Sequence, residues 1–158
     1  MHCKIDHLEK YPGLIPVLAR WHHREWQHLN PVTYDLQARI NDYQQTASDS
    51  TSLPQMLVAH LNGHALGSVR LIESDMDTHP ELGPWLASLF VPPDFRRQGI
   101  ATRLIAEIEV TATQLGFDQL HLFTEDKSEM YSKLGWQEQG REKYYDKQVI
   151  IMAKNLSE

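Results

Sequence analysis

The sequence predicts a mixed α/β (α+β) fold in which a central sheet of about six or seven strands is flanked by about four helices. Segments with the two-residue period of strands alternate with segments of helical period along the chain. In its middle, a strand leads through a basic turn into a long helix and then a further strand, which implies a right-handed parallel crossover. The 158 residues leave room for one domain, residues 1–158, with a sizeable core.

Two helices are expected after a short first strand. Residues 3–8 fit the strand, and residues 13–29 fit the first helix. A second helix is expected over residues 33–45, with Thr33 as its N-cap. The buried stripe of the first helix is expected to comprise Leu14, Val17, Leu18 and Trp21.

A β-hairpin and two connections are expected next. The pair Asn62-Gly63 favours a tight hairpin turn, because both residues tolerate a positive φ angle. The hairpin strands cover residues 53–60 and 65–73, and the flanking connections cover residues 46–52 and 75–84.

The central unit begins as a strand over residues 85–91. The residues on both of its faces are largely apolar, as in a strand that is covered on both sides. Pro92 and Pro93 end its ladder, because proline cannot donate a backbone hydrogen bond. After Gly99 apolar residues recur at helical spacing, and Gly116 ends the helix.

The last elements are expected to be a strand, a short helix and a closing hairpin. The strand covers residues 117–124. Asp126 is the expected N-cap of the short helix, Glu129 completes a capping box, and Gly135 ends the helix. The closing hairpin pairs residues 136–145 with residues 147–154 around Asp146.

The start of the central helix has the features of a phosphate site. Such a start leaves about four N–H groups without partners and carries a partial positive charge. The residues immediately before this helix start are Arg96, Arg97, Gln98 and Gly99. None of them is a Ser, Thr, Asp or Asn, the residues that usually cap a helix. Gly99 lets a ligand approach the backbone. Taken alone, such a turn is more often a solvated basic loop, because short motifs often match by chance.

This segment resembles the acetyl-CoA signature of the GCN5-related N-acetyltransferase (GNAT) family, Arg/Gln-x-x-Gly-x-Gly/Ala, including its apolar Leu-Phe-Val-x-Pro lead-in. In that family the turn and helix start bind the CoA pyrophosphate, and the preceding strand pairs with the pantetheine arm. The resemblance implies acetyl-CoA as cosubstrate, without a metal, bound by Leu89, Phe90, Val91, Arg96, Arg97, Gln98, Gly99, Ile100, Ala101, Thr102 and Asp126.

A second resemblance lies in Met130-Tyr131-Ser132-Lys133-Leu134-Gly135-Trp136, which is similar to a family segment whose Tyr protonates the departing thiolate. A phenol with a pKa of about 10 can donate to a thiolate whose acid has a pKa of about 8.5. The resemblance therefore implies Tyr131 as the general acid. The alternative is a half-buried tyrosine that packs on the sheet.

The general base is less clear from the sequence. The run from Leu120 to Tyr131 resembles the subset of the family that includes the actin N-terminal acetyltransferase. Where the ribosomal-protein acetyltransferases have a Glu base on this strand, the chain has Phe123. Glu25 is the first candidate, because it falls on the buried stripe of its helix, as His28 does. Glu125 and His121 follow, and ordered water is an alternative if the acceptor is an α-amine.

Composition limits the partners and the location. A net charge of −6 argues against a nucleic-acid partner. The single cysteine excludes an internal disulfide, and the nine histidines form no metal-binding motif. Without a membrane-spanning apolar run or a signal peptide, a cytoplasmic location is expected. A small-molecule amine or a peptide N-terminus is the expected acceptor, and the protein is expected to be a monomer or homodimer.

The main hypothesis is an N-acetyltransferase whose acceptor amine attacks the thioester directly in a ternary complex, with main-chain groups at Phe90 and Val91 polarising the acetyl carbonyl. The alternatives are a CoA-binding sensor or regulatory module without turnover, and an interaction domain that binds no CoA. Titration with CoA separates the third from the other two, and the effect of Tyr131→Phe on turnover separates the first two.

Overall fold

The computed structural model describes residues 3–46 and 51–157, and it confirms the predicted mixed α/β fold. Its sheet has seven strands in the order β1-β2-β3-β4-β5-β7-β6. The strands are β1 (Lys4–His7), β2 (Gln55–Leu61), β3 (His64–Ile72), β4 (Trp85–Phe90), β5 (Gln119–Thr124), β6 (Gln137–Tyr144) and β7 (Lys147–Asn155). The α-helices are α1 (Ile15–Trp26), α2 (Leu36–Thr46), α3 (Ile100–Gln114) and α4 (Ser128–Lys133).

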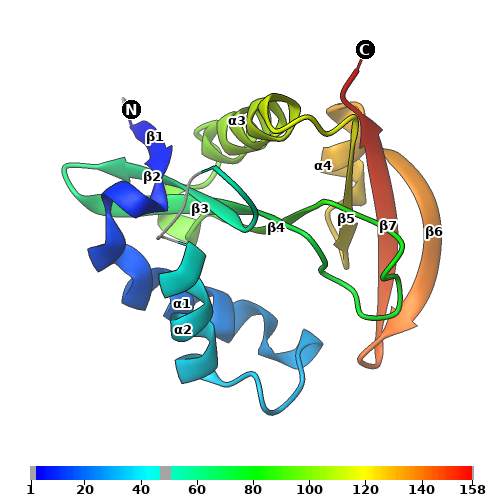
Figure 1. Ribbon diagram of the computed structural model, residues 1–158, viewed down its shortest axis with the longest axis horizontal. Helices are drawn as coiled ribbons and strands as arrows, with labels where there is room; N and C mark the ends of the chain where they lie inside the picture. Colours follow the sequence, from blue (N-terminus) through cyan, green and yellow to red (C-terminus); the bar gives the residue numbers. More distant parts are fainter. Residues whose placement is uncertain (1–2, 47–50, 158) are drawn as a thin grey trace.

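The helices cover the two faces of the sheet (Figure 1). α1 and α2 lie on one face, and α3 and α4 lie on the other. The α3 face is apolar, and its helix contributes Ile100, Leu104, Ile105, Ile108 and Ala112. The opposite face combines apolar residues of α1 and β2 with Tyr43 from α2. The sheet therefore has a core on each side.

The central helix ends as its sequence predicts. Gly116 has a φ of 93°, and the next residue, Phe117, donates its N–H to the carbonyl of Ala112 at 3.0 Å. This is the hydrogen-bonding pattern of a Schellman cap, which requires a left-handed residue and therefore favours glycine. The chain then returns as β5, parallel to β4.

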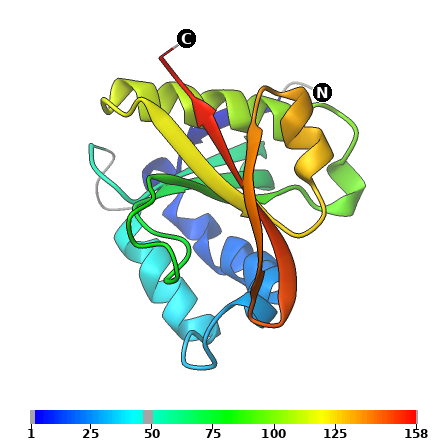
Figure 2. The same cartoon turned by 90° about the vertical axis from the view of Figure 1, so that its right-hand side faces the viewer.

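β4 and β5 separate almost as soon as they meet. Within the described residues, their parallel ladder has the single pair Trp85↔His121. β4 also contains a bulge, where Ser88 has a φ of 54° and the register with β3 shifts between Ser68 and Arg70. Figures 1 and 2 show β4 diverging from the β5–β7–β6 side of the sheet. This divergence opens one end of the sheet beside the start of α3.

The first helix differs from its prediction in length and in its buried face. It covers Ile15–Trp26, with a short 3-10 turn on either side. The predicted stripe is partly confirmed: Leu18 is buried, and Leu14, Val17 and Trp21 are partly buried against the same core cluster. The other fully buried residues of the helix are Ile15, Ala19 and His22. The small Ala19 allows close approach to the sheet, and His22 is buried because both of its ring nitrogens find hydrogen-bond partners.

Two predicted N-caps were also wrong. α2 begins after Asp35, whose Oδ1 accepts the N–H of Ala38 at 2.9 Å, so Thr33 is not the cap. Asp126 does not cap α4 either, because Lys127 occupies the N-cap position and no side chain caps the helix, so the expected capping box with Glu129 is not formed. The Oγ1 of Thr124 accepts the N–H of Lys127 at 3.0 Å. Residues 47–50 of the predicted polar loop lie outside the described residues.

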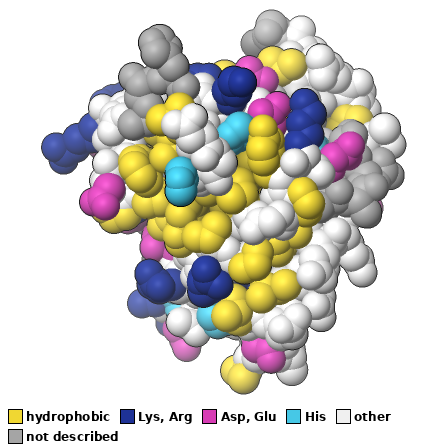
Figure 3. All heavy atoms as spheres, turned by 90° about the vertical axis from the view of Figure 1, so that its left-hand side faces the viewer, with side chains coloured by type: hydrophobic (Ala, Val, Ile, Leu, Met, Phe, Trp, Pro, Cys, Tyr) yellow, Lys and Arg dark blue, Asp and Glu magenta, His cyan; other side chains and the backbone are white. Residues whose placement is uncertain are grey.

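Figure 3 shows the edge of the molecule beside β1 and the β2–β3 turn, where hydrophobic side chains gather between scattered charged groups. Leu61, at the end of β2, is 38% exposed. No helix in residues 3–46 and 51–157 is long and apolar enough to cross a membrane.

The buried face of α3 gives a stability prediction. Ile108→Ala removes a fully buried side chain and is expected to lower the free energy of unfolding by about 2–5 kcal/mol. Val110→Ala, on the same helix, is the control, because Val110 is 50% exposed and its change is expected to stay within about 0.5 kcal/mol. Urea denaturation measures both, and equal effects would contradict the packing of α3.

Candidate functional site

A cavity of about 880 Å³ lies where β4 and β5 diverge. It is bounded by the end of α1, the start of α2, β4, the start of α3, the end of β5 and the start of α4. The predicted site residues that line it are Glu25, Leu89, Phe90, Val91, Arg96, Arg97, Gly99, Ile100, Ala101, Thr102, Asp126 and Tyr131. Gln98 is exposed and does not line the cavity. Segments distant in sequence therefore meet at one concave site.

The turn before α3 has the backbone geometry of an anion site. Gly99 occupies the N-cap position with a φ of 81°, and it has no side chain with which to cap the helix. A Cβ at Gly99 would meet nothing within 4 Å, so the space beside the helix start is open. Arg97 also has a positive φ, 64°, and is exposed. The positive end of α3 and a guanidinium group therefore face the same space.

Arg96 has a different position from Arg97. Its Nε donates to the carbonyl of Val91 at 2.7 Å, and its guanidinium carbon lies 5.8 Å from the centre of the Phe90 ring. Arg96 thus ties the basic turn back to the end of β4. This tie fixes the distance between the helix start and the last residues of the strand.

Tyr131 lies on α4 at the other side of the gap. It is 6% exposed, lines the cavity and packs edge-to-face on Trp136 at 5.9 Å between ring centres. Burial raises the pKa of the Tyr131 phenol above its usual value. The phenol is therefore protonated at neutral pH, which is the form that can donate a proton.

The candidate bases have different surroundings. Glu25 is exposed and lines the cavity. Glu125 also lines it, but its Oε1 lies 2.7 Å from the Nε2 of His28, a contact that bridges the end of α1 and the end of β5. His121 is 7% exposed, stacks beside Trp85 and does not line the cavity. Geometry therefore favours Glu25 among the three.

The wall opposite the basic turn is acidic and aromatic. Its side chains come from segments spread along the chain: Glu25, Trp26, Tyr34, Asp42, Asp75, Asp77, Phe123, Glu125, Tyr144 and Tyr145. Tyr144 donates its O–H to Asp77 at 3.4 Å, and burial raises the pKa of Tyr144 to about 12. Carboxylates beside aromatic rings form a favourable environment for a cationic group.

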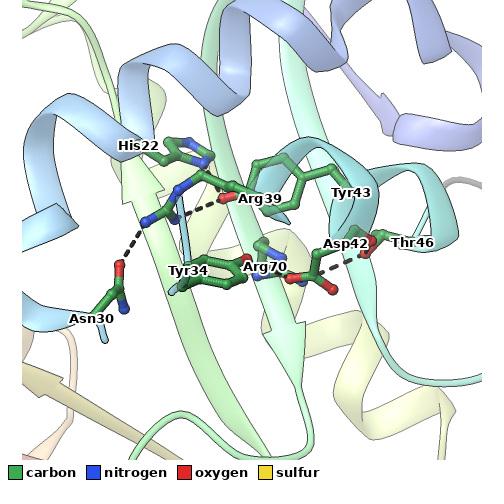
Figure 4. A network of polar contacts seen from close by, with 8 residues as sticks. All are labelled: His22, Asn30, Tyr34, Arg39, Asp42, Tyr43, Thr46 and Arg70. Carbon is green, nitrogen blue, oxygen red and sulfur yellow. Dashed lines mark hydrogen bonds and ion pairs between the residues drawn. The ribbon is translucent and has the colours of Figure 1, made fainter. Parts of the chain in front are cut away.

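Two arginines in this wall have partners within the protein (Figure 4). Arg39 donates to Asn30 Oδ1 at 2.6 Å and to Tyr43 Oη at 3.3 Å. Arg70 donates to Asp42 Oδ2 at 3.3 Å and lies over the ring of Tyr43 at 4.7 Å. These cations therefore shape the wall and partly neutralise its acids.

Among the carboxylates of this wall, Asp75 has the most strongly shifted pKa. Burial raises the pKa of Asp75 to about 6, although the positive charges of Arg70 and Arg39 oppose the shift. Desolvation of the ionised carboxylate therefore outweighs its attraction to the two guanidinium groups. At neutral pH the folded protein holds this carboxylate in an unfavourable environment.

His22 and most of the acidic wall were not among the site residues predicted from the sequence. His22 follows Ile15, Leu18 and Ala19 at helical spacing, so a correct choice of the buried stripe would have placed it inside. The wall residues carry no motif, because they meet only through the tertiary fold. Among the described residues there is no group of three or more His, Cys, Asp or Glu side chains that could hold a metal ion.

Comparisons with known proteins agree with this geometry. A family model described as an acetyltransferase (GNAT) domain matches residues 52–138. No curated protein sequence matches significantly. An aminoglycoside 6'-N-acetyltransferase complexed with coenzyme A has a TM-score of 0.75 at 18% identity, with 97% of each chain covered.

Two further structures show the same fold. One is a putative acetyltransferase from Salmonella typhimurium with its cofactor acetyl-CoA, with a TM-score of 0.75 at 14% identity, covering 98% of this chain and 94% of that chain. The other is an N-acetyltransferase from Thermoplasma acidophilum in complex with coenzyme A, with a TM-score of 0.67 at 18% identity, covering 98% and 99%.

The pKa of Asp75 predicts a pH-dependent stability. The pKa is about 6 in the folded protein and 3.8 ordinarily, so the folded state binds more protons between these values and stability falls as pH rises through them. Asp75→Asn, which cannot ionise, is expected to raise Tm relative to the wild type more at pH 7.5 than at pH 4. Thermal unfolding at both pH values measures this, with the exposed Asp118→Asn as control. A benefit at pH 4 that equals or exceeds that at pH 7.5 would refute the assignment.

Proposed function

The chain belongs to the GNAT acetyltransferase family, and from this premise we propose that residues 1–158 form one domain that transfers the acetyl group of acetyl-CoA to a primary amine. One observation supports this most strongly. A single cavity joins the uncapped start of α3, the diverging edge of β4, the phenol of Tyr131 and an acidic wall. Each feature suits one part of the reactants. The helix start suits a diphosphate, the strand edge suits the thioester arm, the phenol suits a leaving thiolate, and the acidic wall suits an amine.

The cosubstrate is proposed to lie along β4 and the start of α3. The N–H groups of the first turn and the Arg97 guanidinium would bind the pyrophosphate, and the open space at Gly99 fits its approach. Main-chain groups from Leu89 to Val91 would pair with the pantetheine arm, because the described ladder of β4 and β5 ends at its first pair. Gln98 would contribute through its backbone rather than its exposed side chain.

The proposed reaction is direct attack in a ternary complex. The neutral amine nitrogen forms a bond to the thioester carbon, and the carbonyl oxygen becomes an oxyanion held by main-chain N–H groups of β4. The C–S bond then breaks, and the thiolate takes a proton from Tyr131. The amine loses one proton, to Glu25 or to water, so the products are an acetamide and CoA.

The acidic wall supports a particular class of acceptor. Asp42, Asp75, Asp77, Glu25 and Glu125 outnumber the two arginines that line the same wall. We therefore propose a small-molecule amine that carries a further cationic group. The similarity of Leu120–Tyr131 to the actin N-terminal acetyltransferase subset stays a prediction, and a peptide N-terminus is the acceptor that it would favour.

Binding of the cosubstrate can be tested at the basic turn. Arg97→Glu is expected to weaken acetyl-CoA binding at least about tenfold, because a charge-assisted contact is replaced by repulsion of the diphosphate. Arg20→Glu is the matched control, because Arg20 is exposed on α1 and does not line the cavity. Isothermal titration calorimetry measures both. Equal affinities for the two variants would remove Arg97 from the site.

Turnover can be tested at Tyr131. With acetyl-CoA and a panel of diamines, aminoglycosides and peptide N-termini, we expect release of free thiol with the cationic small molecules. Tyr131→Phe is expected to lower kcat about 10²-fold or more while CoA affinity stays within twofold, because the variant lacks only the hydroxyl.

The outcomes separate the alternatives. CoA binding without thiol release for any amine would support a sensor module instead of an enzyme. Thiol release that Tyr131→Phe leaves unchanged would retain the enzyme and reject the acid. Acetylation of peptide N-termini alone would reject the small-molecule acceptor.

A further inference from the structure

A buried chain of hydrogen bonds connects α2 to the bulge of β4. Arg39 Nη1 lies 3.3 Å from Tyr43 Oη, which lies 2.7 Å from His22 Nδ1. His22 Nε2 lies 2.7 Å from Ser68 Oγ, and this hydroxyl donates to the carbonyl of Ser88 at 3.0 Å. The four side chains, here called the buried relay, are each at most 4% exposed. Figure 4 shows its outer part, in which His22 and Arg39 both point toward Tyr43.

The Ser88 end sets the first hydrogen-bond direction in the buried relay. A carbonyl only accepts, so Ser68 donates to Ser88 and accepts a hydrogen bond from the Nε2–H of His22. Burial and the positive charges of Arg39 and Arg70 lower the pKa of His22, so the ring is neutral and its Nδ1 is an acceptor. The O–H of Tyr43 therefore donates to His22 Nδ1, and the oxygen of Tyr43 accepts from Arg39, whose guanidinium only donates.

The last hydrogen bond orients one peptide group. Ser88 has a φ of 54°, an unfavourable conformation for a residue with a Cβ, so the bulge requires support. The Ser88–Leu89 peptide is trans, so its N–H points opposite to its carbonyl. Because the carbonyl points to Ser68 on β3, the N–H of Leu89 points away from β3, toward the side where β5 diverges. Ser88 and Leu89 both line the cavity there.

We propose that Ser68, held in place by His22 and Tyr43, is a positioning residue for acetyl transfer: it aims the N–H of Leu89 at the thioester carbonyl oxygen of acetyl-CoA. This inference rests on the proposed function. A donor fixed before the reaction stabilises the developing oxyanion without reorganisation, which is the usual source of large electrostatic effects in acyl transfer. The buried relay does not touch the substrate, and it acts only through the Ser88–Leu89 peptide.

A purely structural role would not require these polar contacts. Apolar side chains already hold α1 against the sheet at Ile15, Leu18 and Ala19. A buried polar network needs every partner satisfied, and apolar residues of similar shape often replace one without loss of stability. The buried relay ends on a backbone carbonyl of the bulge that lines the cavity. This terminal contact therefore indicates that the role of the buried relay is to orient the Ser88–Leu89 peptide.

The test measures the thioester carbonyl directly and needs no acceptor. Infrared difference spectra of bound [1-¹³C]acetyl-CoA report hydrogen bonding as a shift of the carbonyl stretch to lower frequency than in free acetyl-CoA. We expect this shift in the wild type and its loss in Ser68→Ala, with CoA affinity within about threefold. Leu8→Ala is the control, because Leu8 is fully buried in the same core cluster as Tyr43 and is outside the buried relay. It is expected to lower Tm and keep the shift.

Further variants make the outcome decisive. Tyr43→Phe removes only the hydroxyl at the far end and is expected to reduce the shift, and it replaces Ser68→Ala if that variant does not fold. His22→Gln keeps an N–H near Ser68 and is expected to retain more of the shift than His22→Leu. With an amine that the wild type acetylates, Ser68→Ala is expected to lower kcat about tenfold or more, while its KM for acetyl-CoA changes little.

The two proposals fail in different ways. A wild type that binds acetyl-CoA with a full carbonyl shift, alongside Ser68→Ala and Tyr43→Phe with the same shift, overturns the role of the buried relay and leaves the proposed function standing. A wild type that binds acetyl-CoA without any carbonyl shift also overturns it. A wild type that does not bind acetyl-CoA overturns the proposed function and this inference with it.

Discussion

The structure of the site depends on the early separation of β4 from β5. The two parallel strands share the pair Trp85↔His121 and, within the described residues, no later pair. The N–H of His121 also donates to the carbonyl of Pro84 at 3.0 Å, so the junction is held at its base and diverges from there. Backbone groups of a central strand are thereby left facing a cavity, where an extended ligand can pair with them.

The two faces of the sheet contribute differently to this cavity. On one face, the fully buried Leu104 and Ile108 hold α3 in position, and Arg96 ties the turn before it to Val91. On the other face, α1 and α2 meet the sheet through polar groups as well, including His22, Ser68 and Arg70. The apolar face therefore fixes the basic turn before α3, and the polar face shapes the acidic wall and supports the bulge.

The sequence predicted the elements and most of the residues that line the cavity at β4 and the start of α3, because these depend on local signals. Alternating apolar residues, Gly99, Gly116 and Pro92 each act within a few positions of themselves. The N-caps at Thr33 and Asp126 were wrong because the fold decides where each helix begins: α2 begins after Asp35, and Lys127 occupies the N-cap position of α4.

The polar face could not be predicted in the same way. His22 joins Tyr43 and Ser68, which lie 21 and 46 positions away, and no short motif encodes such a meeting. A histidine on an otherwise apolar stripe indicates only that partners must exist if it is buried. The carboxylates of the acidic wall likewise come from α1, α2 and the segments after β3 and β5, so their clustering is visible only after folding.

The wall and the bulge are built from the same groups. Arg39 lines the same cavity as the acidic wall and also begins the buried relay, in which its guanidinium donates to Tyr43. A protonated His22 would lose the acceptor at Nδ1 and would place a third positive charge beside Arg39 and Arg70. The network therefore favours a neutral His22. It follows that α2, which contributes Arg39 and Asp42 to the lining of the cavity, also supports the orientation of the Ser88–Leu89 peptide, so that the places proposed for the amine and for the thioester carbonyl depend on one connected arrangement.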